Sequence, residues 1–158
     1  MKVQGEYSLP LSQQAAWDLL LNTDVLSRAM PGCEALVPIG PDEYEMKMKI
    51  AISSIQGLFA GKVRIADKNP PASYRLIIEG QGKLGFLRGS GLLKLAADGG
   101  QTRVNYTGDV QIGGLVASVG ERMLDMTGKM MIKRFFSALV KEAESSAGGG
   151  GVANSAMP

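Results

Sequence analysis

Apolar and polar side chains alternate along most of the sequence before Gly113, as they do in strands that bury one face. Lys2 to Leu9 shows this pattern, and Tyr44 to Ile52 shows it most clearly. Glycine, proline and aspartate separate the alternating segments and favour turns between them. The pattern predicts antiparallel strands at residues 2–9, 35–39, 44–52, 59–67, 74–80, 91–97 and 102–112.

Two short helices are predicted directly after the first strand. Ser12 is a suitable N-cap for the first helix, and Trp17 lies on its apolar face. The second helix covers Val25 to Met30 and ends at Pro31-Gly32, because proline and glycine interrupt helices.

After Gly113-Gly114 the spacing of apolar residues changes from two to about 3.6, which predicts one long amphipathic helix, roughly Leu115 to Glu144. Its apolar residues fall into two neighbouring stripes. One stripe consists of Val116, Val119, Met123, Met126 and Met130, and the other of Leu124, Met131, Phe135 and Leu139. A helix of this length needs a long apolar surface to cover, and a curved sheet provides one.

Together these elements predict an α+β domain over residues 1–145, followed by a flexible glycine-rich tail over residues 146–158. The expected architecture is a helix-grip fold. In this fold a curved antiparallel sheet of six or seven strands wraps around the long C-terminal helix, with two short helices after the first strand.

A bent sheet and a helix touch at their ends and can separate in the middle, which leaves an apolar cavity of the kind that binds small molecules. We predict that this cavity binds a hydrophobic ligand. Its predicted lining consists of Met46, Met48, Ile50, Phe59, Val63, Ile78, Leu93, Tyr106, Met123, Met126 and Met130. Methionine also fills irregular gaps in ordinary cores, so core packing is the alternative interpretation of the methionine positions.

The composition excludes several kinds of chemistry. Without a histidine the chain cannot form a Ser-His-Asp or Cys-His relay, and the single cysteine, Cys33, cannot supply a structural zinc site or an internal disulfide. A net charge of +2 and an aromatic content of 6% do not fit a nucleic-acid-binding surface. The predicted inward faces carry no Asp, Glu, Lys or Arg, so we expect no catalytic residue, no metal and no covalent cofactor.

A glycine-rich segment from Gly80 to Gly91 carries a second candidate site. Phe86, Leu87 and Arg88 combine two large apolar side chains with a cation, which suits contact with a membrane surface or a partner protein. One interpretation is a mobile lip beside the cavity, and the alternative is a hairpin tip folded onto the body of the domain.

Several short runs carry a resemblance to a known family. The runs are Lys2-Val3-Gln4-Gly5-Glu6-Tyr7, Ala16-Trp17-Asp18-Leu19-Leu20, Met30-Pro31-Gly32-Cys33-Glu34, Phe59-Ala60-Gly61-Lys62-Val63, Asp67-Lys68-Asn69-Pro70-Pro71 and Gly80-Gln81-Gly82. Together they resemble the CoxG family of carbon monoxide dehydrogenase subunits, within the START-like, polyketide-cyclase-like (SRPBCC) superfamily.

The resemblance implies a non-enzymatic carrier that holds a quinone or another lipid and serves a molybdenum hydroxylase such as CO dehydrogenase, in membrane recruitment or electron delivery. Two alternatives remain open, a cyclase- or hydratase-type enzyme on the same fold and a pure assembly factor. The N-terminus lacks the apolar core of a secretory signal, and no stretch reaches the roughly 18 apolar residues of a membrane span. We therefore expect a cytoplasmic protein with at most peripheral contact at the inner face of the membrane.

Overall fold

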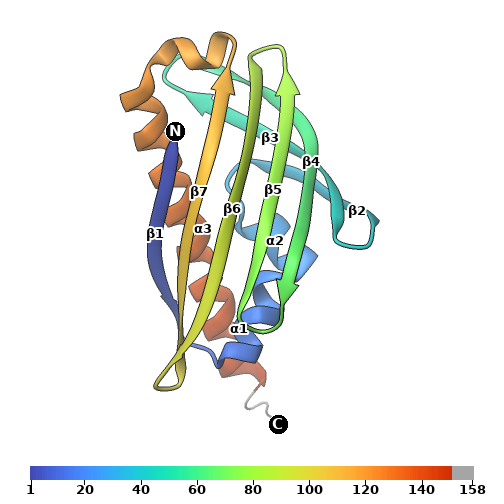
Figure 1. Cartoon of the computed structure of the whole chain (residues 1–158), viewed down its shortest axis with the longest axis vertical. Helices are drawn as coiled ribbons and strands as arrows, with labels where there is room; N and C mark the ends of the chain where they lie inside the picture. Colours follow the sequence, from blue (N-terminus) through green and yellow to red (C-terminus); the bar gives the residue numbers. More distant parts are fainter. Residues whose placement is uncertain (151–158) are drawn as a thin grey trace.

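The computed structural model describes residues 1–150, with side chains described as far as Ser145. Seven antiparallel strands form one sheet in the order β1-β7-β6-β5-β4-β3-β2 (Figure 1). Successive strands from β2 to β7 are joined as hairpins, and β1 lies against β7. The strands are β1 (Lys2–Leu9), β2 (Cys33–Gly40), β3 (Glu43–Ile52), β4 (Ile55–Asn69), β5 (Ser73–Gly82), β6 (Gly85–Asp98) and β7 (Gln101–Gly113).

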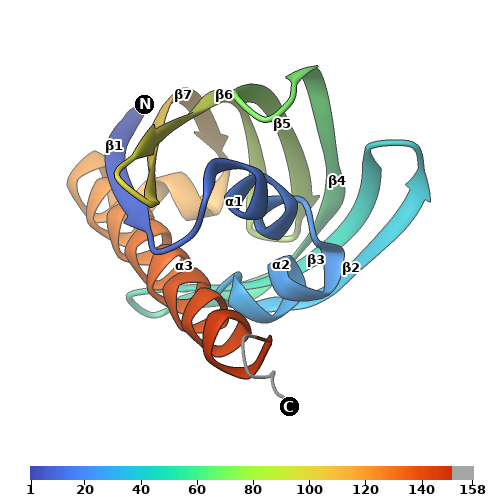
Figure 2. The same cartoon turned by 90° about the horizontal axis from the view of Figure 1, so that it is seen from below.

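Glycines on the inward face allow the sheet to bend. Gly61 pairs with Gly80, and Gly91 pairs with Gly108 on the neighbouring strand. A Cβ atom at Gly61 would collide with the backbone of Glu79 and Gly80, so β4 and β5 approach more closely there than a side chain would permit. Figure 2 shows the result, a strongly curved sheet.

The two predicted short helices are present and lie at one end of the curled sheet, which the view of Figure 2 shows in front. They are α1 (Gln13–Leu20) and α2 (Thr23–Ala29). The Ser12 hydroxyl accepts a hydrogen bond from the backbone N–H of Ala15, and Asn22 Oδ1 accepts one from Val25. These bonds satisfy amides in the first helical turns that would otherwise lack a partner, which explains where both helices begin.

The long C-terminal helix differs from its prediction at both ends. Residues Leu115–Val119 form a 3-10 helix, η1, and the regular helix α3 covers Glu121–Gly150. Gly120 separates them with a φ of +97°, a conformation that glycine adopts without strain. Residues 146–150 of the predicted tail belong to α3, and the remainder of that tail, 151–158, lies outside the described residues. The predicted α+β helix-grip architecture is otherwise confirmed.

The apolar core is divided into two clusters of buried side chains. The larger lies at the end covered by α1 and α2 and includes Trp17, Tyr74 and Phe136. The smaller consists of Ile52, Phe59 and Val116, with Leu124 and Ile112 packed against it. Inward-facing side chains between the two clusters are only half-buried, and they include Met46, Ile78, Val110 and Met131. Sheet and helix are therefore packed together at both ends and less completely in the middle.

Candidate functional site

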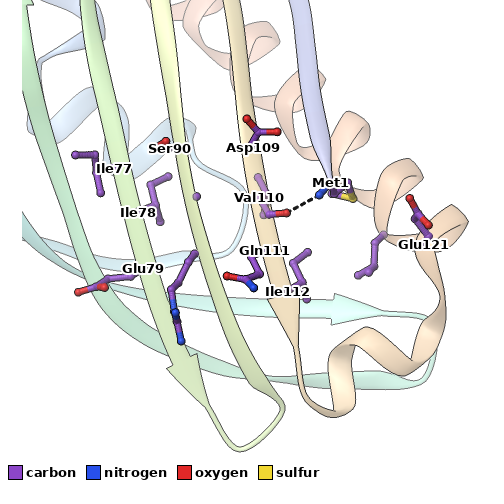
Figure 3. Close-up of a pocket in the computed structure, with 13 residues that line it drawn as sticks. Met1, Ile77, Ile78, Glu79, Ser90, Asp109, Val110, Gln111, Ile112 and Glu121 are labelled. Carbon is purple, nitrogen blue, oxygen red and sulfur yellow. Dashed lines mark hydrogen bonds between the residues drawn. The ribbon is translucent and has the colours of Figure 1, made fainter.

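A hollow of about 770 Å³ lies beside the half-buried middle of the sheet. Its apolar lining comes from the inward face of β5 and β7 and from the start of α3, at Ile78, Val110, Ile112 and Leu124 (Figure 3). Several polar residues also border it, namely Glu79, Arg88, Ser90, Asp109 and Gln111. These occupy alternate positions of the same strands and so belong to the outward face of the sheet.

A glycine contributes to the open space on the sheet side of the hollow. Gly89, an inward position of β6, lines the hollow, and the inward positions Gly91 and Gly108 are also glycines. On α3, Gly128 lies four residues after Leu124, on the same side of the helix. Within the described part of the chain, a Cβ atom at Gly128 would have no neighbour within 4 Å. The side chain that is absent at Gly89 therefore leaves space on the sheet side of the hollow.

Stacked aromatic rings belong to the larger apolar cluster and its surroundings. The ring centroids of Tyr7 and Phe136 are 4.4 Å apart with an interplanar angle of 9°, and Tyr106 lies 6.3 Å from Tyr7. The Tyr106 hydroxyl lies over Gly5, where a side chain would collide with it. Burial, with a smaller contribution from Tyr7, raises the pKa of Tyr106, so this phenol stays neutral at physiological pH and can donate a hydrogen bond.

The structure places the eight predicted strand residues on the inward face, but it brings only one of them to the hollow. Ile78 lines it. Met48, Phe59 and Val63 are buried by packing within the core, while Ile50, Leu93 and Tyr106 pack against one of the two apolar clusters and Met46 is half-buried. Sequence reasoning did not identify Val110, Ile112, Leu124 or the glycines. A glycine within the apolar stripe of a long helix was the available signal for Gly128.

The prediction that Met123, Met126 and Met130 line the cavity is wrong. Their side chains are 38%, 60% and 43% exposed and lie on the side of α3 that faces away from the sheet. The other predicted stripe, with Phe135 and Leu139, packs against the larger cluster instead. Both stripes have helical spacing, and the larger apolar area of the phenylalanine-containing stripe explains which one is buried.

The predicted contact residues Phe86, Leu87 and Arg88 lie in β6, within the hairpin that β5 and β6 form. Leu87 points inward, whereas Phe86 and Arg88 share the outward face. There the Arg88 guanidinium carbon lies 4.8 Å from the centroid of the Phe86 ring, a cation–π contact. The three side chains therefore do not form one continuous surface, and contact of Phe86 and Arg88 with a membrane or a partner stays a prediction.

The inward positions of the seven strands carry no charged side chain in the described part of the chain. Among the same residues, no group of three or more Cys, Asp or Glu side chains is placed to hold a metal ion. Within residues 1–150, no helix is long and apolar enough to cross a bilayer. Chemically, the hollow offers apolar side chains from the inward face of the sheet and the start of α3, bordered by the polar and charged side chains of Glu79, Arg88, Ser90, Asp109, Gln111 and Glu121.

Comparison with known proteins fits this geometry. The family model for the CoxG subunit of carbon monoxide dehydrogenase matches residues 5–144. The chain belongs to the CoxG family. The family name implies association with carbon monoxide dehydrogenase, and family and fold together suggest a role in binding a hydrophobic ligand. No curated protein matches the sequence.

Solved structures similar to this CoxG-family chain include a conserved protein from Geobacillus kaustophilus, with 31% identity, a TM-score of 0.88, and coverage of 92% of this chain and 97% of that one. Two more distant structures share the fold. One is the Zhui aromatase/cyclase from Streptomyces sp. R1128, with 12% identity, a TM-score of 0.70, and coverage of 92% of this chain and 94% of that one. The other is a START superfamily protein from Mycobacterium smegmatis, with 11% identity, a TM-score of 0.68, and coverage of 90% of this chain and 97% of that one. The chain therefore has the START-like helix-grip fold.

Proposed function

We propose that this protein is a non-enzymatic carrier that holds a quinone or a similar lipid in the hollow between sheet and helix. The observation that carries the proposal is the hollow of about 770 Å³, which lies beside the smaller apolar cluster and is lined by Ile78, Val110, Ile112 and Leu124. The inward positions of the strands around it carry no charged side chain in the described part of the chain. Uptake of an apolar molecule into such a space is favourable, because it removes apolar surface from water.

In the proposed arrangement a quinone reaches from the apolar walls of the hollow to the aromatic side chains of the larger cluster. A quinone head is a flat ring with carbonyl acceptors, and the Tyr106 phenol can donate to such an acceptor. Tyr7, Tyr106 and Phe136 offer ring faces for stacking. The aliphatic chain of a quinone would extend toward Ile112 and Leu124.

The proposed partner is a molybdenum hydroxylase of the CO dehydrogenase type, for which the family name is the support. In this role the protein shields a guest rather than converting it. General acid–base catalysis needs a titratable side chain directed at the reacting atoms, and the described inward strand positions supply only tyrosines and the Cys33 thiol of that kind.

Extraction of the purified full chain with organic solvent, followed by mass spectrometry, tests the proposal directly. A co-purifying quinone or lipid, or saturable binding of decylubiquinone by the extracted protein, supports it. Absence of both contradicts it and favours the assembly factor. Turnover of a polyketide-like or CoA-linked substrate would favour an enzyme instead.

A charge introduced into the hollow is expected to abolish guest binding. Ile78→Asp places a carboxylate on the inward face of β5, where an apolar guest cannot compensate for its desolvation, so we expect at least a tenfold loss of decylubiquinone affinity. Leu58→Asp is the control, because Leu58 lies on the outward face of β4, is 52% exposed and does not line the hollow. Titration calorimetry on both variants checks the result, and equal losses would place the guest elsewhere.

We further propose that the protein makes peripheral contact with an anionic membrane. The outward side of α3 supports this proposal. Met126, Met130, Lys133, Ser137 and Lys141 follow one another at helical spacing along this side. A shallow groove of about 480 Å³ continues from Met130 between Lys133, Arg134 and Lys141, and no acidic residue borders it. Exposed methionines flanked by cations complement anionic headgroups above an apolar layer.

Removal of these cations is expected to weaken membrane binding. The triple variant Lys133→Ala, Arg134→Ala, Lys141→Ala should lose roughly a hundredfold in affinity for vesicles of phosphatidylglycerol and phosphatidylcholine, since each cation contributes about 1 kcal/mol. The control is a second triple variant, Lys47→Ala, Lys49→Ala, Lys62→Ala, which changes the net charge by the same amount on the outward face of the sheet. Vesicle sedimentation measures both, and a similar loss in the control would show that net charge alone is responsible.

A further inference from the structure

Tyr74 is a buried tyrosine whose hydroxyl makes no hydrogen bond to any other group within residues 1–145. It is 3% exposed, and burial raises the pKa of the phenol well above its ordinary value, so the group stays neutral. Thr102, which is also buried, donates its hydroxyl to the carbonyl oxygen of Leu11 at 2.8 Å. A buried hydroxyl without such a partner destabilises the fold, and native structures pair nearly all of them.

A second buried donor lies beside this phenol. The ring of Trp17 meets that of Tyr74 edge to face, with the centroids 5.5 Å apart, and Trp17 is 6% exposed. In the described chain its indole N–H makes no hydrogen bond either. Two neighbouring donors without an acceptor indicate an oxygen atom that does not belong to the chain, either that of an ordered water or that of a bound molecule.

An open strip of the inward face leads from the hollow to Tyr74. On β5 the inward residues Ile78 and Leu76 are half-buried, and Tyr74 is the next inward residue and is fully buried. Their partners on β6 are Gly89 and Gly91, which have no side chain. Ile78 and Gly89 also line the hollow. A guest that extends along this strip therefore meets Tyr74 at its far end.

We propose that the Tyr74 hydroxyl is the hydrogen-bond donor for a carbonyl oxygen of the guest. This rests on the proposed function and adds where the polar head of the guest lies and which group holds it. Tyr74 on β5 and Tyr106 on β7 both flank Leu93, in one row across the sheet. The spacing of neighbouring strands puts their Cα atoms about 10 Å apart. A quinone has carbonyls on opposite sides of its ring, so each phenol has one acceptor in this arrangement.

Tyr74→Phe tests the proposal, because it removes the hydroxyl and keeps the ring. Titration calorimetry of the extracted full chain with decylubiquinone should show a five- to tenfold loss of affinity, about the effect of one neutral hydrogen bond. In the infrared spectrum of bound decylubiquinone, one carbonyl band that the hydrogen bond shifts to lower frequency should lose that shift in the variant. The Tm without a guest should not fall, because no hydrogen bond within the protein is lost.

Thr102→Val is the matched control, since it removes a buried hydroxyl whose hydrogen bond lies within the protein. We expect a lower Tm and unchanged affinity. If Tyr74→Phe behaved in this way, its hydroxyl would hold an ordered water, and this inference alone would be overturned. Loss of affinity with an unchanged carbonyl band would also overturn it, because altered packing would then be the cause. A wild type that does not bind decylubiquinone would overturn the proposed function and this inference with it.

Discussion

Replacement of Phe136 by alanine is expected to lower the free energy of unfolding by about 3–5 kcal/mol. The Phe136 side chain is 3% exposed and belongs to the larger apolar cluster. It stacks on Tyr7 and meets the Phe135 ring edge to face at 5.2 Å. Truncation removes this contact area and leaves a cavity within the larger apolar cluster. A loss of this size is a large fraction of the stability of an ordinary domain.

Urea denaturation followed by the fluorescence of Trp17 measures this effect. Met126→Ala removes an apolar side chain from the same helix at a position that is 60% exposed, and its stability should stay within about 0.5 kcal/mol of the wild type. If Phe136→Ala cost no more than Met126→Ala, the helix would not be packed against β1 and β7 as described.

The second large effect is expected at Gly61, one residue of a glycine pair that spans β4 and β5. A methyl group there would run into the carbonyl of Glu79 and the Cα atom of Gly80, which are backbone atoms that cannot rotate away. Gly61→Ala should therefore cost about 3 kcal/mol by forcing the two strands apart. Its partner Gly80 is the matched control, since a Cβ atom there would meet Met46 Cε at 3.6 Å, an ordinary contact distance.

Thermal unfolding of both variants by circular dichroism distinguishes the two positions. Gly80→Ala should melt close to the wild type, whereas Gly61→Ala should melt well below it. Equal melting temperatures of the two variants would contradict the difference in available space at Gly61 and Gly80, and with it the explanation of how the sheet bends.

The strands could be predicted from the sequence because each buries one face only. Alternation along β3, from Tyr44 to Ile52, identifies both the strand and the face that points inward. The segment around Gly85 could not be interpreted in this way, because glycines contribute no side chain to either face. The structure shows a hairpin there, with Gly85 at a φ of +132° against the backbone of Gly113.

The site was harder to predict than the fold, because a helix with two apolar stripes does not show which of them meets the sheet. Met126 and Phe135 are equally consistent with helical spacing. The choice depends on the area each stripe buries against its neighbours, which is a property of the assembled fold. The hollow is a still weaker signal in sequence, since part of its lining is Gly89, a position without a side chain.

The divided apolar core has a consequence for the turnover of the protein in a cell. An occupied hollow would join the two clusters into one continuous apolar interior, and binding to the folded state alone adds stability according to guest concentration. Copies without a guest would open locally more often, and proteases act on opened segments. We therefore expect degradation to remove unloaded copies first, so that the amount of this protein follows the supply of its guest.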